Sequence, residues 1–147
     1  MLIGEYTHNL DDKKRLSVPA KFRRELGDGA VLTQGLDGCL WLFPSRQWKQ
    51  LAERIAALPP WQADSRSLSR LFLASASEVE FDGLGRILIP DYLKQYGGLK
   101  RQVVFTGVHT RVELWDADAW TAYKKKLGKQ AEATAQKLGG SGLDIHE

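Results

Sequence analysis

The sequence is poor in the residues that build disulfide scaffolds and metal centres. Cys39 is the only cysteine, so the chain has no internal disulfide and no cysteine-based metal site, and we expect a reducing compartment. The three histidines, His8, His109 and His146, are scattered and show no i,i+4 spacing. We therefore expect neither a metal site nor a histidine-based nucleophilic centre.

Long apolar runs are also missing. No segment reaches the ~18 apolar residues that a membrane-spanning helix needs. The opening segment MLIGEYTHNL has no basic stretch, and Glu5 interrupts its apolar residues, so it does not resemble a secretory signal. These absences predict a cytoplasmic protein without a membrane partner.

Motifs of catalysis are equally scarce. The chain contains neither a Walker loop nor a GxSxG elbow. The glycine-rich segment GLGR around Arg86 precedes an apolar strand pattern, whereas a dinucleotide fingerprint precedes a helix. We expect a protein that is not an enzyme and that has no cofactor and no small-molecule substrate.

What remains is an ordinary globular composition. The chain has 147 residues, of which 43% are hydrophobic and 27% charged, enough for one domain with a sizeable core. It carries 21 Lys and Arg against 18 Asp and Glu, a net charge of +3. This balance permits a polyanionic partner without requiring one. The placement of the charges along the chain must therefore show whether such a partner is expected.

An internal repeat organises the chain. Asp11, Arg15 and Pro19 recur as Asp82, Arg86 and Pro90 at a constant offset of 71, and the apolar residues between them match as well. From Gly35, which matches Gly107, the offset is 72. Each copy is about 45 residues, which is near the lower limit for independent folding, so we expect the two copies to share one core.

Each copy has the pattern strand, turn, strand, short helix, two strands, helix. RLSVP and RILIP are β-rich segments after polar turns, and a proline then opens the amphipathic stretches AKFRREL and DYLKQYG. The fold class predicted is α+β, mostly β. We expect repeats at 5–50 and 76–123, a connecting helical segment at 51–75 with Leu68, Leu71 and Phe72 on one face, and a basic helix end with a mobile tail at 124–147.

Basic residues concentrate around the first copy of the motif. The segment from Asp11 to Glu25 has six basic and three acidic residues. Two interpretations are open. A narrow hairpin tip with DDKKR could enter a DNA groove, where cationic side chains reach phosphates or the edge of guanine. Alternatively, Asp11 and Arg15 form a structural pair and the lysines are merely solvated.

The motifs NLDDKKRLSVPAKFR, ASEVEFDGLGRILIP and ELWDADAW resemble those of the MraZ family of transcriptional regulators, over residues 1 to 125. The resemblance implies two tandem swapped-hairpin repeats of the AbrB/SpoVT type around a barrel-like core. It also implies DNA contacts by Lys13, Lys14, Arg15 and Arg86. Asp11, Asp82, Gly83 and Gly85 would shape the turns and orient the arginines. Lys14 departs from the pattern, which has glycine before the arginine, as at Gly85, so the first turn could differ in shape.

The resemblance further implies a repressor that binds direct repeats in double-stranded DNA upstream of its own division and cell-wall operon, as a homo-oligomeric ring within the nucleoid. Two other functions stay open, a ring-forming scaffold for proteins and a sequence-independent nucleoid protein. Weaker candidates for phosphate contacts are the run KKKLGK at 124–129, for which a solvated surface is the alternative, and the pair Arg66 and Arg70, for which salt bridges between subunits are the alternative. The five tryptophans could stack on bases, but four of them lie in expected strands or on helix faces beside apolar residues, so positions in the core or at a subunit interface are favoured.

Overall fold

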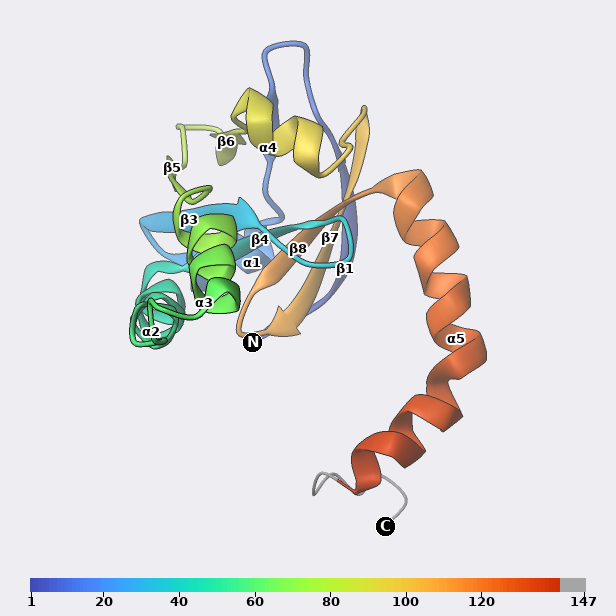
Figure 1. Ribbon diagram of the computed structural model, residues 1–147. Helices are drawn as coiled ribbons and strands as arrows, with labels where there is room; N and C mark the ends of the chain where they lie inside the picture. The colour runs from blue at the N-terminus through green and yellow to red at the C-terminus, as the bar shows by residue number, and fades with distance from the viewer. Residues whose placement is uncertain (141–147) are drawn as a thin grey trace. The chain divides into compact units, whose positions relative to one another are not determined.

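The computed structural model describes residues 1–140 and divides the chain into two compact units, Met1–Ala117 and the segment from Asp118 onward (Figure 1). The first unit contains β1 (Leu2–Asn9), β2 (Arg15–Ser17), α1 (Ala20–Leu26), β3 (Gly29–Gln34), β4 (Leu40–Pro44), α2 (Ser45–Ala56), α3 (Ala63–Leu68), the π-helical turn η1 (Ser69–Leu73), β5 (Ser77–Glu80), β6 (Arg86–Leu88), α4 (Asp91–Tyr96), β7 (Gln102–His109) and β8 (Val112–Asp116). The second unit is formed by α5 (Ala117–Gly139), whose first residue belongs to the first unit. The prediction of a mostly β, α+β fold is confirmed.

The strands exchange partners between the two copies of the repeat. Six of them form an antiparallel sheet in the order β1-β7-β8-β4-β3-β5. The first strand of each copy is added to the hairpin of the other, β1 to β7 and β5 to β3, while β4 and β8 join the two hairpins. The remaining strands, β2 and β6, pair with each other as a separate two-stranded ribbon.

A single core lies between the two copies, as the repeat predicts. Residues at equivalent positions are buried together: Leu16 with Ile87 in the ribbon, and Phe22 with Leu93 from the short helices α1 and α4. All four side chains are at most 1% exposed. Because each copy supplies half of this apolar cluster, neither has a core of its own.

The short helices begin and end where the sequence predicts. Pro19 and Pro90 precede α1 and α4, where the missing proline N–H costs nothing because it would have no helical partner. Gly27 and Gly97 follow them, and the Gly27 N–H donates to the carbonyl of Arg23. These helices place the apolar side chains that cover the ribbon from the core side.

The connecting segment differs from the expected helix with one apolar face. It contains the end of α2, then α3 followed by η1, and it buries Phe72 but leaves Leu68 38% exposed. At the end of the segment the Thr33 hydroxyl donates to the Phe72 carbonyl at 2.7 Å and contacts Ser75 Oγ at 2.9 Å. These bonds hold the end of the segment on β3.

The C-terminal segment is helical further than the glycine content suggests. Helix α5 extends to Gly139, through the stretch AEATAQKL, which is rich in good helix formers. The helical part of the segment 124–147 therefore reaches Gly139. The rest of that segment from residue 141, including His146, lies outside the described residues. Over residues 1–140, no helix combines the length and apolarity needed to cross a membrane.

The tryptophans of the first unit have different environments. Trp115 is 3% exposed and belongs to the buried residues. The Trp41 ring stacks on Phe72 with centroids 5.3 Å apart, and the Arg111 guanidinium lies 4.2 Å from the centroid of the Trp41 ring. Trp61, between α2 and α3, is 78% exposed. Core packing thus accounts for Trp115 and Trp41 but not for Trp61.

Candidate nucleic-acid interface

The two repeated motifs form turns with the same hydrogen bonds. In the first, Asp11 Oδ1 accepts from the backbone N–H of Lys13 at 2.9 Å and of Arg15 at 2.8 Å. In the second, Asp82 Oδ1 accepts from the N–H of Leu84 and of Arg86, both at 2.9 Å. The carboxylate that opens each turn therefore satisfies two amides that would otherwise lack a partner in the chain.

Each of these aspartates also holds the arginine of its own turn. The second carboxylate oxygen accepts from the arginine Nε, at 3.0 Å for Asp11 and Arg15 and at 2.8 Å for Asp82 and Arg86. The backbone N–H of the arginine, followed by its side chain, lowers the pKa of both carboxyls below the ordinary value of 3.8. Both groups are thus charged near neutral pH and orient the guanidinium groups.

Lys14 adopts the backbone conformation of the glycine that it replaces. Its φ is 60°, close to the 75° of Gly85 at the equivalent position. In both turns this residue donates its N–H to the aspartate carbonyl at 3.0 Å. The departure from the motif therefore leaves the turn shape intact and places a non-glycine residue in the left-handed region, at a cost in strain.

The ribbon of β2 and β6 brings the two arginines onto one face. Arg15 lies opposite Leu88, and Ser17 lies opposite Arg86. Because side chains alternate along a strand, these four residues share the face that points away from the core, opposite the buried Leu16 and Ile87. Arg15 and Arg86 are diagonal neighbours on this face, with side chains 35% and 24% exposed.

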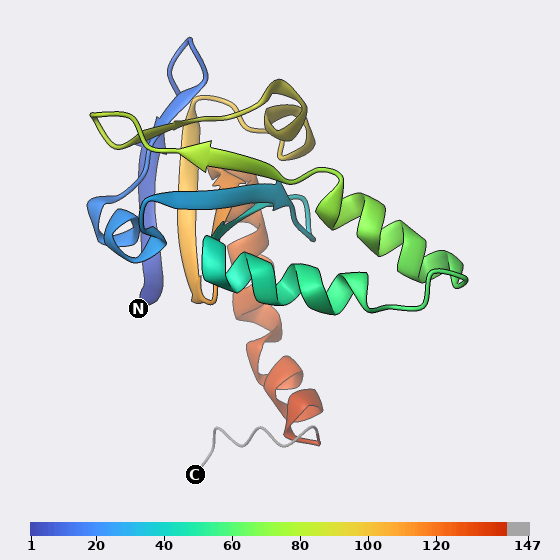
Figure 2. The same ribbon diagram turned by 90° about the vertical axis from the view of Figure 1, so that its left-hand side faces the viewer.

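One carboxylate connects the two turns. Asp11 Oδ2, which binds Arg15, lies 4.0 Å from Nη1 of Arg86. The two turns stand at opposite ends of the ribbon, because β2 and β6 are antiparallel and each follows its turn. In Figure 2 the blue turn between β1 and β2 points to the top, and the yellow-green turn between β5 and β6 points to the left. The ribbon face and the two turns thus form a continuous surface.

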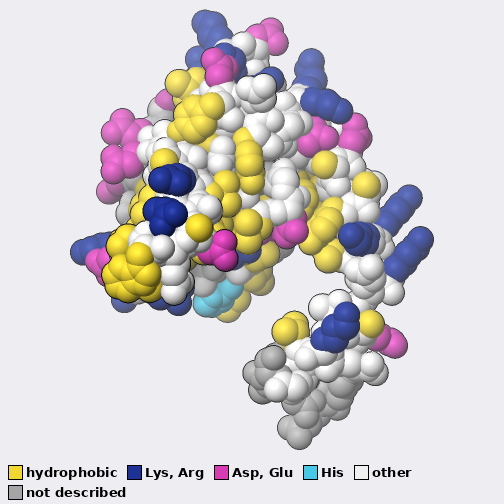
Figure 3. Space-filling view, in the orientation of Figure 1, with side chains coloured by type: hydrophobic (Ala, Val, Ile, Leu, Met, Phe, Trp, Pro, Cys, Tyr) yellow, Lys and Arg dark blue, Asp and Glu magenta, His cyan; other side chains and the backbone are white. Residues whose placement is uncertain are grey.

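The first turn is basic at its tip, but one of its two lysines is paired. Lys14 Nζ forms an ion pair with Asp91 at the start of α4, whereas Lys13 is exposed. Figure 3 shows basic side chains gathered over the loop between β1 and β2. Lys13 therefore has the more available ammonium group of the two.

The second turn has no basic side chain at its tip and receives one from α1. Arg23 Nη1 donates to the Leu84 carbonyl at 3.4 Å. Its guanidinium also occupies the space that a Cβ on Gly85 would fill. Sequence reasoning did not single out Arg23, because nothing in the spacing signals a contact between residues 61 positions apart.

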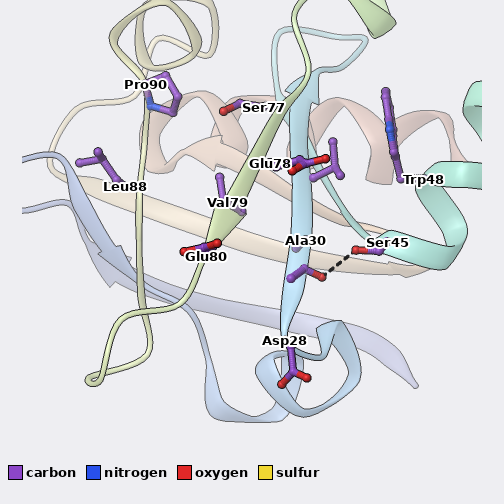
Figure 4. Close-up of a pocket in the computed structure, with 12 residues that line it drawn as sticks. Asp28, Ala30, Ser45, Trp48, Ser77, Glu78, Val79, Glu80, Leu88 and Pro90 are labelled. Atoms are coloured by element: carbon purple, nitrogen blue, oxygen red, sulfur yellow. Dashed lines mark hydrogen bonds between the residues drawn. The ribbon is translucent and has the colours of Figure 1, made fainter.

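The face is bordered by an acidic hollow. The hollow lies beside β3 and β5, and its lining includes the apolar residues Leu88 and Pro90 and the carboxylates of Asp28, Glu78 and Glu80 (Figure 4). A polyanion is repelled by such a rim. Leu88 lines the hollow and also belongs to the ribbon face, so it marks the boundary between the two surfaces.

The other candidates belong to other parts of the chain. Arg66 donates to the Pro60 carbonyl at 3.0 Å, next to the connecting segment. The basic run 124–129 lies on α5, in the second unit, with exposed side chains. Among residues 1–140, no group of three or more His, Cys, Asp and Glu side chains is placed to hold a metal ion.

Comparison with known proteins agrees with the two-copy architecture. The family model described as "MraZ protein, putative antitoxin-like" matches the chain twice, at residues 1–71 and 72–139. The chain is 44% identical over 138 residues to the transcriptional regulator MraZ of Heliobacterium modesticaldum, covering 94% of this chain and 96% of that protein. It is 41% identical over 145 residues to the protein of the same name from Desulforamulus reducens, covering 99% of each.

Proposed function

The chain belongs to the MraZ family, and on that premise we propose that it is a sequence-specific DNA-binding transcriptional regulator whose reading surface is the ribbon of β2 and β6. The observation that carries the proposal is the placement of Arg15 and Arg86 on one exposed face of that ribbon, each held by an aspartate. The names of the relatives, transcriptional regulators throughout, support the assignment.

The fixed arginines suit base recognition. Each aspartate accepts from Nε, and within residues 1–140 only Nη1 of Arg86 also faces a carboxylate, that of Asp11 at 4.0 Å. Nη groups of both guanidinium groups thus remain to reach O6 and N7 of a guanine in the major groove. Lys13 and Lys14 extend the same surface toward the phosphates, and a two-stranded ribbon is narrow enough to enter the groove. Asp11 and Asp82 orient the arginines and do not themselves meet the polyanion.

We further propose that the protein assembles head to tail into a ring and binds direct repeats. Among the described residues, β1 and β5 stand at the two ends of the sheet, each with a ladder on one side only. A head-to-tail contact between these two edges repeats in one rotational sense and presents the ribbon of every protomer in the same orientation. This arrangement matches direct repeats in the DNA and not a palindrome. A spacing near one helical turn, ~10 base pairs, would keep the repeats on one face of the duplex.

The target that we propose is DNA upstream of the chain's own gene, in a division and cell-wall operon, with repression as the outcome. The test is fluorescence anisotropy at near-physiological salt with that DNA and with a shuffled duplex of equal composition. Tighter binding to the upstream DNA is expected, with log affinity falling linearly against log salt as phosphate contacts release counterions.

Two results would contradict this assignment. Equal affinity for both duplexes would point to a sequence-independent nucleoid protein, and no binding to either would point to a scaffold for other proteins. An Arg54→Ala variant is the control for charge, because Arg54 is an exposed arginine in the last turn of α2, outside the ribbon. It should bind like the unmodified chain.

A further inference from the structure

The two turns have matching backbones but unlike tips. Lys13 in the first turn corresponds to Leu84 in the second, and the N–H of each donates to Oδ1 of the aspartate that opens its turn at 2.9 Å. The two side chains therefore leave the backbone from the same position. Lys13 ends in an ammonium group, whereas Leu84 is apolar and still 70% exposed.

The tip that carries Leu84 is held in place from both sides. Its N–H binds Asp82, and its carbonyl accepts from Arg23 of α1 at 3.4 Å. A side chain presented on a fixed backbone loses less conformational entropy when it meets a partner. Leu84 is thus a preorganised contact and not a residue on a loose loop.

Leu84 is also tied to the arginine of its turn. The backbone N–H groups of Leu84 and Arg86 bind the same oxygen, Asp82 Oδ1, both at 2.9 Å. Where Arg86 approaches the edge of a base, Leu84 approaches the DNA with it. An apolar side chain gains nothing from a phosphate, and the apolar group that base pairs display in the major groove is the C5-methyl of thymine.

We propose that Leu84 is a specificity-determining residue that packs against the C5-methyl group of a thymine, while Lys13 at the equivalent position contacts a phosphate. The proposal rests on the proposed function, since it requires the ribbon to face DNA. It assigns different tasks to two tips of the same backbone shape, one that adds affinity and one that adds sequence preference.

The experiment replaces single thymines of the upstream DNA by deoxyuridine, which pairs as thymine does and lacks only the methyl group. The unmodified chain should lose about three- to five-fold in affinity at one or more positions, the effect of withdrawing one methyl from an apolar contact. A Leu84→Ala variant should bind the thymine and uracil duplexes equally at those positions. Circular dichroism checks that the variant is folded, as expected for an exposed side chain.

Two controls define the result. Lys13→Ala should weaken binding to both duplexes alike and keep their ratio, and Leu68→Ala, at an exposed leucine of α3, should change neither. If the unmodified chain binds upstream DNA specifically but ignores every methyl group, the inference is wrong and the proposed function survives. The inference is also wrong if a Leu84→Ala variant keeps the preference for thymine over uracil. This holds even if the oligomeric mass of the variant changes. A chain that shows no preference for upstream DNA overturns both proposals.

Discussion

Asp11 lies within 4.0 Å of Arg86, an arginine of the other repeat, while it also binds Arg15 of its own turn at 3.0 Å. Asp82 has one such arginine partner in the described residues, Arg86 at 2.8 Å. The two carboxylates are therefore equivalent in sequence but unequal in what they support. Asp11 helps to orient both guanidinium groups of the ribbon face.

Loss of either arginine should remove specific DNA binding without affecting folding. Arg15→Ala and Arg86→Ala each delete a contact of about 1–3 kcal/mol per site, so we expect a loss of affinity for upstream DNA of about five-fold to 150-fold. Anisotropy measures the loss, and size-exclusion chromatography with light scattering should show an unchanged assembly. A variant that binds like the unmodified chain at the same concentration would refute the role of that arginine.

The inequality of the two aspartates predicts an inequality of their variants. Asp11→Asn should reduce affinity for upstream DNA more than Asp82→Asn, because the first removes a charge that faces two arginines and the second a charge that faces one. Both substitutions keep an oxygen that accepts from the turn amides. Equal losses in a parallel titration would argue against the shared role of Asp11.

Substitutions at the left-handed position should have opposite effects in the two turns. Gly85→Ala should lower the free energy of unfolding by about 1–3 kcal/mol, because φ is 75° and the added Cβ meets the Arg23 guanidinium. Lys14→Gly relieves strain of about 1 kcal/mol but loses an exposed ion pair with Asp91, so stability should rise slightly or stay level. Urea unfolding of both variants tests this, and a destabilised Lys14→Gly variant would count against it.

The turn carboxylates should titrate at unusually low pH. A carboxyl whose pKa is lower in the folded chain than 3.8 stabilises the fold above that pH, and this contribution is lost as the pH falls through the folded pKa. Carbon-detected NMR should give values below 3.8 for Asp11 and Asp82. In Arg15→Ala the pKa of Asp11 should rise only in part, since the backbone N–H of residue 15 is the largest cause and remains. A full return to 3.8 would show that the side chain dominates.

The thiol of Cys39 should be inert in the folded chain. The side chain is buried, and burial, with Glu113 nearby, raises its pKa from 9.0 to about 12. The folded chain should resist iodoacetamide at pH 8.5 and react once unfolded in urea. Because the folded pKa is raised, stability should decline between pH 9 and 12, where the unfolded thiol ionises first. Rapid labelling of the folded chain would show that the thiol is accessible.

Much of the fold follows from the repeat. The offset of 71 pairs Phe22 with Leu93 and Leu16 with Ile87, and these pairs are buried because equivalent positions meet across a shared core. The exchange of strands is implied by the family resemblance and not by periodicity, since the period of β2 is the same whether it pairs with β1 or with β6. The hydrogen bonds of Thr33 to Phe72 in the π-helical turn η1 and to Ser75 join residues far apart in the chain, which no periodicity encodes.

The candidate site also contains features that the sequence predicts and features that it does not. The pairing of each aspartate with an arginine four residues later is local, and the spacing makes it visible. The partners of the tips are not local: Asp91 meets Lys14, and Arg23 meets Leu84, only because strand exchange brings each helix to the other repeat's turn. Such contacts cannot be predicted from the spacing of residues along the chain; they follow only once the topology is known.

The exchange of strands within one chain also removes a symmetry requirement. If each repeat were a separate chain, two identical copies would have to meet to complete the core, and every substitution at a tip would appear twice. Here both halves are encoded in one polypeptide, so Lys13 and Leu84 occupy matching positions without being alike. Because the two repeats are linked in one chain, they need not be identical, and a turn of one repeat can change while the residues of the shared core stay the same.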